Sequence, residues 1–238
     1  MKEILKTNWD SENYQRFISE LKKEQDLKYR EFHLGILGVD KNIIGIRTPR
    51  LKEIARKISK GDWRGFISIA GRELYEESVL KGLVIGYVDM SFRERIEHIE
   101  EFIRDIDNWA VCDICVGNFK FIKKNLEVFY PFVKQCIYSH ETWKIRVGLV
   151  ILLDYYMNEE YCEDIFALCT DVKKDSYYVK MAQAWLISIL FINFRERTLR
   201  FLEENDLDSW IQNKAIQKIR ESTRVSVEDK HLVLNMKK

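Results

Sequence analysis

The sequence is poor in the residues that form tight turns, with only 2 prolines and 10 glycines among 238 residues. β-Sandwiches, β-barrels and doubly wound sheets need many tight turns, and such turns use glycine and proline. The sequence also shows no alternating polar and apolar pattern of useful length, which a half-buried strand would require. Both absences weigh against β-rich architectures and favour helices joined by short polar loops.

Long hydrophobic runs are absent as well. A membrane-spanning helix needs about 20 consecutive apolar residues, and the longest apolar run here is nine residues or fewer. Residues 1–15 contain no apolar core of a secretory signal. The five cysteines are an odd number in a chain without such a signal, so we expect reduced thiols and a cytoplasmic location.

No sign of charge dominates the whole chain, because the formal net charge is +1. The charge is nevertheless unevenly distributed: residues 41–72 hold nine Lys or Arg against two acids, and residues 214–224 have a net charge of +3. Residues 154–175 are acidic, with a net charge of −5. A basic stripe suits the phosphate backbone of nucleic acid, although a solvated helix face gives the same pattern.

Apolar residues recur at the spacing of amphipathic helices. After Thr48-Pro49, the apolar positions 51, 54, 55 and 58 fall on one helical face. We therefore predict a helix that Thr48 caps, with Pro49 at its first position.

Other helix starts are marked by capping residues. Ser91 and Glu94 predict a capping box. Asn125 predicts a further start, and Pro131 predicts a kink or a break in that helix. Three more helices are predicted at residues 176–193, 208–222 and 226–235.

The predicted helices recur in pairs. The pairs begin near residues 91, 125, 159 and 196, at intervals of 34, 34 and 37 residues. This period predicts an all-α fold: an α-solenoid of HEAT-like helix–turn–helix repeats with a concave inner face. Residues 1–88 fit the same plan with less regular spacing, and no linker is visible, so we predict a single domain over 1–238.

Aligning the repeats places aromatic and charged residues in one row. The positions at 34-residue intervals are Trp109, Trp143, Tyr177 and Ile211, which has Trp210 beside it. About one helical turn later come Asp113, Arg146, Lys180 and Lys214. In an α-solenoid the second helices of the pairs line the concave surface, so we expect this row on the inner face. Aromatic residues at a repeat period can instead be core packing, although burying the accompanying charges would be costly.

Four segments in this frame resemble a known family. They are Ile44–Pro49, Asp107–Asp113, Trp143–Arg146 and Tyr177–Trp185, in this order within residues 27–222. On these segments the chain resembles the bacterial DNA alkylation repair family of HEAT-like DNA glycosylases, which excise N3- and N7-alkylated purines. The resemblance implies double-stranded DNA carrying alkylated bases as the partner, nucleoid association when bound, and neither a metal nor a cofactor. We expect a monomer.

The family's catalytic pattern carries over to particular residues here. It implies that Asp113, Trp109 and Trp185 are catalytic, with Asp113 stabilising an oxocarbenium-like sugar and the two indoles contacting the lesion. The DNA-binding residues expected are Arg146, Lys180, Arg47, Arg50 and Lys214.

Two other functions stay open at this level. One is a non-catalytic family member that recognises damaged or branched DNA, and the other is a solenoid scaffold that takes a peptide or partner helix. Cys112 and Cys115 form a C-x-x-C motif, but the sequence has no second ligand pair for zinc and no βαβ context for thioredoxin chemistry.

Overall fold

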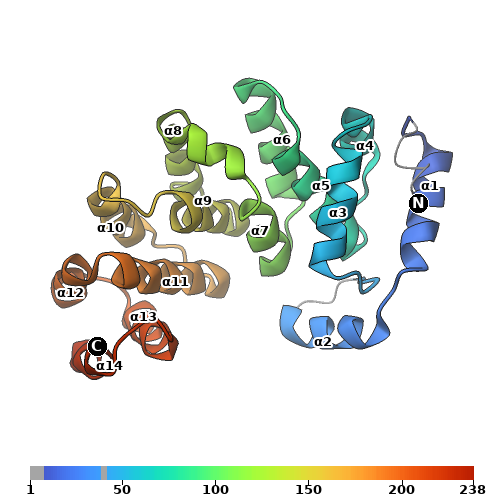
Figure 1. The fold of residues 1–238 in the computed structure, drawn as a ribbon. Coiled ribbons are helices and arrows are strands. Elements are labelled where there is room, and N and C mark those ends of the chain that lie inside the picture. The colour runs from blue at the N-terminus through green and yellow to red at the C-terminus, as the bar shows by residue number, and fades with distance from the viewer. Residues whose placement is uncertain (1–7, 39–41) are drawn as a thin grey trace. The chain divides into compact units, whose positions relative to one another are not determined.

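A computed structural model describes residues 8–38 and 42–238, and it is all-α (Figure 1). Among these residues there is no β-strand, and an isolated bridge pairs Asn42 with Leu74. The prediction of an all-α fold is thus confirmed. Over the same residues, none of the helices has the length and apolar character needed to cross a membrane.

The chain divides into two compact units, residues 1–121 and 122–238. The helices of the first unit are α1 (Ser11–Lys22), α2 (Leu27–Leu37), α3 (Thr48–Ile58), α4 (Trp63–Ile69), α5 (Tyr75–Tyr87), α6 (Phe92–Arg104) and α7 (Trp109–Val116). Those of the second are α8 (Leu126–Ile137), α9 (Thr142–Tyr155), α10 (Cys162–Asp171), α11 (Tyr177–Asn193), α12 (Arg195–Glu204), α13 (Ser209–Glu221) and α14 (Val227–Leu232). Short 3-10 turns occur at Lys120–Lys124 and Val233–Met236. That the chain is a single domain stays a prediction.

In the first unit, α5 is the central helix. It packs against α3, α4, α6 and α7 (Figure 1), and most of its side chains are buried. Gly82 permits a close approach to α7, because a Cβ at this position would lie 2.5 Å from the sulfur of Cys115. The position of α7 is therefore fixed by direct packing on α5.

In the second unit, α11 has the central place. It lies between α9 and α13 and also contacts α10 and α12 (Figure 1). The half-buried residues of α11 include Tyr178, Met181 and Trp185, at spacings of three and four residues. Residues at these spacings share one helical face, so α11 presents one partly accessible stripe and buries the rest.

The cap at the start of α3 differs from the prediction. Arg47 is the N-cap residue and has no side-chain capping hydrogen bond, while Thr48 and Pro49 already lie inside the helix. The prediction of Thr48 as the cap is therefore wrong, although the predicted helix is present. Proline is tolerated throughout the first turn of a helix, so Pro49 does not specify which residue is the cap.

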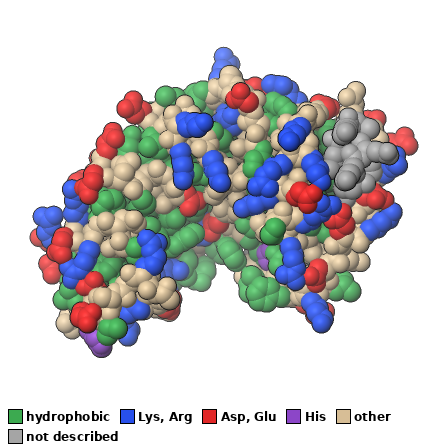
Figure 2. All heavy atoms as spheres, viewed as in Figure 1, with side chains coloured by type: hydrophobic (Ala, Val, Ile, Leu, Met, Phe, Trp, Pro, Cys, Tyr) green, Lys and Arg blue, Asp and Glu red, His purple; other side chains and the backbone are tan. Residues whose placement is uncertain are grey.

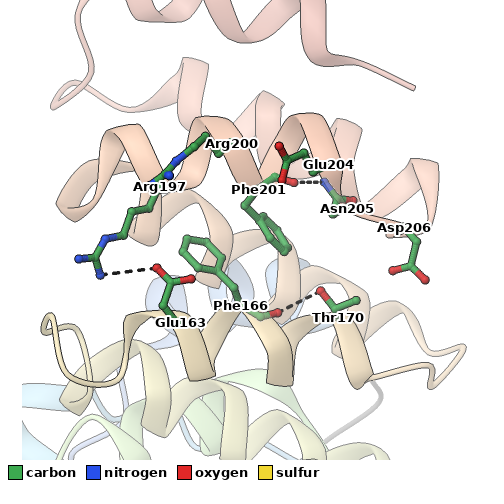
Figure 3. A pocket seen from close by; sticks show the side chains of 9 residues that line it. All are labelled: Glu163, Phe166, Thr170, Arg197, Arg200, Phe201, Glu204, Asn205 and Asp206. Carbon is green, nitrogen blue, oxygen red and sulfur yellow. Dashed lines mark hydrogen bonds and ion pairs between the residues drawn. The ribbon is translucent and has the colours of Figure 1, made fainter.

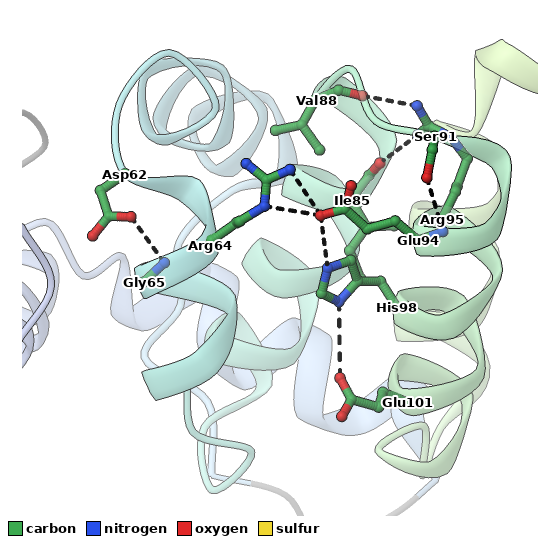
Figure 4. A network of polar contacts seen from close by, with 10 residues as sticks. All are labelled: Asp62, Arg64, Gly65, Ile85, Val88, Ser91, Glu94, Arg95, His98 and Glu101. Atoms are coloured by element: carbon green, nitrogen blue, oxygen red, sulfur yellow. Dashed lines mark hydrogen bonds and ion pairs between the residues drawn. The ribbon is translucent and has the colours of Figure 1, made fainter.

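The predicted capping box at Ser91 is only half formed. The hydroxyl of Ser91 accepts a hydrogen bond from the backbone N–H of Glu94, at 3.2 Å. The carboxylate of Glu94 instead accepts from Arg64 at 2.8 Å and lies 3.9 Å from His98 (Figure 4). A charged partner on another helix thus takes the carboxylate that the local pattern assigned to the cap.

Pro131 does not break its helix, since α8 runs without interruption from Leu126 to Ile137. Of the two predicted outcomes, a kink or a break, the break is therefore wrong, and the kink stays a prediction. The other predicted helix starts hold, because Ser176, Asp208 and Ser226 are the N-cap residues of α11, α13 and α14.

Candidate nucleic-acid interface

The first turn of α7 is set by a buried asparagine. Asn108 is fully buried, and its side-chain oxygen accepts a hydrogen bond from the backbone N–H of Val111 at 3.0 Å. Its amide nitrogen donates to the carboxylate of Asp107 at 2.7 Å. A capping asparagine satisfies an otherwise unpaired N–H of the first turn. The sequence Asp-Asn-Trp therefore makes Trp109 the first residue of α7.

Trp109 and Asp113 lie one helical turn apart on α7, and both are half-buried. The indole N–H of Trp109 donates to the backbone carbonyl of Ile36 on α2, at 3.4 Å. Residues four apart on a helix share one face. The structure thus brings these two predicted residues together, with the indole edge fixed against α2.

The loop that precedes α3 is held by a buried glutamate on α5. Glu76 is fully buried, and its carboxylate accepts backbone N–H groups from Ile44 at 2.9 Å, Gly45 at 2.8 Å and Ile46 at 3.1 Å. Three donors on one carboxylate satisfy a buried charge that would otherwise be costly. The sequence alone gave no signal for Glu76, because its partners lie about 30 residues earlier.

Gly45 connects this loop to the start of α2. Its φ is +100°, and a Cβ there would lie 2.6 Å from the carbonyl oxygen of Asp26. The carbonyl of Gly45 accepts from the N–H of Asp26 at 3.1 Å. Only glycine fits this backbone conformation without strain. The segment Ile44–Pro49 therefore has a structural role: it anchors α2, which carries the Ile36 carbonyl that binds Trp109.

Arg47 and Arg50 both pair with acids of the first unit. Arg47 donates to Asp26 at 2.8 and 3.1 Å and lies 4.9 Å from the centre of the Tyr29 ring. A backbone hydrogen bond from Tyr29, followed by the guanidinium of Arg47, lowers the pKa of Asp26. Arg50 binds Glu24 through two donors, at 2.6 and 2.7 Å. Both arginines are therefore already paired with acidic side chains in the protein without DNA.

Acids within and outside the basic segment 41–72 compensate much of its charge. Further ion pairs are Lys57–Glu53 at 2.5 Å, Arg64–Glu94 at 2.8 Å and Arg72–Asp105 at 3.5 Å. Figure 2 shows acidic side chains among the basic ones over the region of α3. Lys57 and Arg50 lower the pKa of Glu53 to about 2. Lys41 lies outside the described residues. The surface around this segment therefore carries less net positive charge than the segment's sequence alone indicates.

In the second unit, four aromatic rings form a continuous line, here called the aromatic ridge. The ring centres are 5.0 Å apart for Trp143 and Tyr178, 5.4 Å for Tyr178 and Tyr177, and 6.0 Å for Tyr177 and Trp210. Tyr177 is 60% exposed, so the ridge is not core packing. Ile211 is buried, and its neighbour Trp210 takes the surface position of that repeat.

The predicted cations of the second unit differ in their surroundings. Arg146 is buried and donates to the carbonyl of Tyr178 at 2.7 Å. The ammonium of Lys214 lies 5.7 Å from the centre of the Trp210 ring. Lys180 pairs with Asp175 at 2.8 Å and Asp208 at 3.6 Å, and the Asp175 hydrogen bond raises the pKa of Lys180 most. Arg146 and Lys214 therefore border the ridge, whereas acids already compensate Lys180.

Trp185 is half-buried and lies seven residues after Tyr178 on the accessible stripe of α11. Between them, the fully buried Gln183 donates to the carbonyls of Cys169 at 2.8 Å and Val172 at 3.1 Å. Gln183 thus ties α11 to the end of α10. Gln183 belongs to the family-like segment Tyr177–Trp185, but nothing in the sequence indicates this role, because its partners lie on another helix and in the loop after it.

Other features of the structure do not involve the predicted residues. A hollow of about 580 Å³ lies between α10 and α12, where the rings of Phe166 and Phe201 stack at 4.6 Å (Figure 3).

All five cysteines are buried free thiols, and burial raises the pKa of Cys115. No group of three or more His, Cys, Asp or Glu side chains in the described part of the chain is arranged to hold a metal ion.

Comparison with known proteins gives a family match over most of the chain. The model of the family described as DNA alkylation repair enzyme matches residues 12–219. Neither a curated protein nor a solved structure shows significant similarity to the chain.

Proposed function

The chain belongs to the DNA alkylation repair enzyme family, and from this we propose that it is a DNA glycosylase for cationic N3- or N7-alkylated purines in duplex DNA. The observation that carries the proposal is the pair on α7: a half-buried carboxylate, Asp113, one turn after an indole that α2 holds in place. The required partner is double-stranded DNA, and the required chemistry is hydrolysis of one N-glycosidic bond.

The reaction suits a site with a single carboxylate. An N3- or N7-alkylated purine already carries a positive charge, so it leaves as a neutral base without a general acid. As the C1′–N bond breaks, its electron pair goes to the base and positive charge develops on the sugar. Asp113 stabilises this charge and orients the water that adds to C1′, and the water's proton passes to Asp113 or to solvent.

The indoles of Trp109 and Trp185 supply selectivity in this proposal. A cation over an indole face gains about 0.5–2 kcal/mol, and a neutral base does not gain this energy. The hydrogen bond from Trp109 to Ile36 fixes the ring before DNA arrives, which limits the ordering cost on binding. Arg146 and Lys214 bind phosphates, while Arg47, Arg50 and Lys180 bind them by exchanging their carboxylate partners.

We also propose that the helix pairs are HEAT-like repeats of an α-solenoid. The first helices of four successive pairs begin at Phe92, Leu126, Cys162 and Arg195, which are 34, 36 and 33 residues apart. Within each unit, alternate helices pack side by side: α3, α5 and α7 in the first, and α9, α11 and α13 in the second. Stacking of this kind supports a repeat architecture.

The test is base release from methylated duplex DNA. We expect wild-type protein to release 7-methylguanine or 3-methyladenine, and Asp113→Asn to lower the rate by about 10²- to 10³-fold while leaving DNA binding largely intact. Asp89→Asn is the matched control, because Asp89 is an exposed aspartate of the same unit. It should retain the wild-type rate.

Two outcomes would replace this proposal. Salt-dependent DNA binding without base release, with a known glycosylase working in parallel, would indicate a non-catalytic DNA-binding member of the family. Absence of DNA binding at about 50 mM salt, where phosphate contacts are strongest, would indicate a protein-interaction scaffold.

A further inference from the structure

The aromatic ridge has no role in the proposed reaction, although two of its rings are open to solvent. Tyr177 is 60% exposed and Trp210 is 37% exposed, and their ring centres lie 6.0 Å apart. Trp143 and Tyr178 continue the line and are half-buried. The rings belong to α9, α11 and α13, and α11 packs against both of the others (Figure 1). Contiguous exposed rings of this kind indicate a surface that binds a ligand.

The backbone that carries these rings is fixed before any ligand binds. The carbonyl of Tyr178 accepts a hydrogen bond from the buried Arg146 at 2.7 Å, which ties the first turn of α11 to α9. The backbone N–H of Trp210 donates to the side chain of Asp208 at 2.8 Å, which caps α13. Aromatic side chains on a rigid backbone lose little conformational entropy on binding.

The charges beside the two exposed rings largely compensate one another. Lys180 lies 2.8 Å from Asp175 and 3.6 Å from Asp208. These acids lie two residues before Tyr177 and two residues before Trp210, respectively. The rings are therefore the main binding feature at this place, and we expect the group that lies on them to be flat and uncharged.

Continuity with the proposed site indicates which ligand supplies such a group. Tyr178 and Trp185 share the accessible stripe of α11, and seven residues of helix span about 10 Å. This length equals about three nucleotide steps of 3.4 Å. A strand whose lesion lies at Trp185 therefore reaches the ridge within a few nucleotides. The ammonium of Lys214, 5.7 Å from the centre of the Trp210 ring, complements the charge of such a strand.

The orientation of the rings indicates which part of the strand they bind. In an intact duplex each base is stacked between its neighbours, and the grooves present only base edges. A base offers its flat face to a protein ring only where it is unpaired or unstacked. Neither neighbour is stacked parallel to the Tyr177 ring, because the interplanar angles are 78° with Tyr178 and 64° with Trp210. The Tyr177 ring is thus open to a base.

We propose that the aromatic ridge binds unpaired bases of a DNA strand, with Tyr177 and Trp210 each stacking on one base. The ligand class is single-stranded DNA next to a duplex, such as a gap or a locally opened segment near the lesion. The inference rests on the proposed function in taking DNA as the ligand, and it adds a specificity for unpaired nucleotides that the reaction itself does not require.

The test compares binding of the full chain to an undamaged duplex and to the same duplex with a short single-stranded gap. We expect the gapped duplex to bind more tightly, and Tyr177→Ala to weaken only this binding, by about 5- to 20-fold. Tyr177→Phe keeps the ring and should bind like the wild type. The slope of log K against log salt should stay unchanged in Tyr177→Ala, because no charge is lost.

Tyr138→Ala is the matched control. Tyr138 is 58% exposed and belongs to the same unit, but its hydroxyl donates to Asp171 at 2.9 Å and its ring is not part of the ridge. This variant should leave both affinities unchanged. Circular dichroism and a thermal melt check that each variant is folded. In a second arm, oligothymidylate is added while tryptophan fluorescence is followed; quenching should be smaller in Trp210→Phe, because a stacked base quenches indole fluorescence.

The outcomes separate this inference from the proposed function. Unchanged binding of the gapped duplex by Tyr177→Ala overturns the inference and leaves the glycosylase proposal standing. Equal weakening of both duplexes also overturns it, because the ring then contacts the intact helix. A loss confined to the gapped duplex, in a protein that releases no alkylated base, supports the inference and overturns only the glycosylase. Failure of the wild-type protein to bind any DNA overturns both.

Discussion

Replacing Glu76 by glutamine tests whether its carboxylate holds the loop that anchors α2. In the wild-type protein one carboxylate oxygen accepts from Gly45 at 2.8 Å and Ile46 at 3.1 Å, and the other accepts from Ile44 at 2.9 Å. Glutamine has nearly the same shape, so the change removes charge and one acceptor without opening a cavity. The effect therefore reports on hydrogen bonding rather than packing.

The magnitude follows from the three bonds. The glutamine oxygen still accepts two of the N–H groups, but each bond loses its charge assistance, at a cost of about 1 kcal/mol. The amide nitrogen faces the N–H of the third residue, which leaves a buried donor unpaired at a cost of about 1–3 kcal/mol. We therefore expect Glu76→Gln to lower the free energy of unfolding by about 3–5 kcal/mol, a large part of the about 5–15 kcal/mol typical of a folded protein.

The measurement is urea denaturation followed by circular dichroism, with hydrogen exchange of the amides of Ile44, Gly45 and Ile46 as a local readout. Glu73→Gln is the control, because the same chemical change falls on an exposed residue three positions earlier. It should change stability by less than about 0.5 kcal/mol. A loss below about 1 kcal/mol for Glu76→Gln, with unchanged exchange of the three amides, would refute the anchoring role of this carboxylate.

Two further predictions concern helix ends. Asn108→Ala removes the buried cap of α7 and should cost about 1–2 kcal/mol, with faster hydrogen exchange at Val111; unchanged exchange there would contradict the capping role. Arg195, which donates to Asp229 at 2.5 to 2.9 Å, lowers the pKa of that carboxyl. A depressed folded-state pKa gives stability that is present above the ordinary aspartate pKa and is lost as the pH falls through the folded value. The protection factors of the α14 amides, measured against the intrinsic exchange rate at each pH, should therefore fall on acidification, and this acid response should be absent in Asp229→Asn; an equal response in both proteins would rule the pair out as its cause.

The helices could be predicted largely because their signals are local. Ser176, Asp208 and Ser226 each precede an apolar repeat and each become an N-cap residue. Asp208 accepts from the N–H of Trp210 and Ser226 accepts from the N–H of Asp229, so the sequence contains the whole capping interaction at these two positions. Ser176 takes the N-cap position without a side-chain hydrogen bond. Thr48 is the exception, since proline in the first turn does not specify which residue precedes the helix.

The surroundings of the candidate residues could not be predicted in the same way. The acids that pair with Arg47 and Arg50 come from positions 26 and 24, more than 20 residues earlier. Glu76 meets its three donors about 30 residues away. Such pairs depend on how helices pack, and a net charge of a segment does not contain that information.

The ion pairs also rank the cations that were predicted from the sequence to bind DNA. The side chain of Arg47 is 62% exposed and uses one oxygen of Asp26, whose other oxygen caps α2 by accepting from the N–H of Tyr29. Arg47 can therefore leave for a phosphate without uncapping α2, and an exposed pair of this kind is weak. Arg50 is only 31% exposed and holds Glu24 through two donors as well as Glu53, which raises its pKa. Exchange at Arg50 breaks three charge-assisted bonds for one phosphate, so of these two arginines Arg47 exchanges its acidic partner for a DNA phosphate more readily.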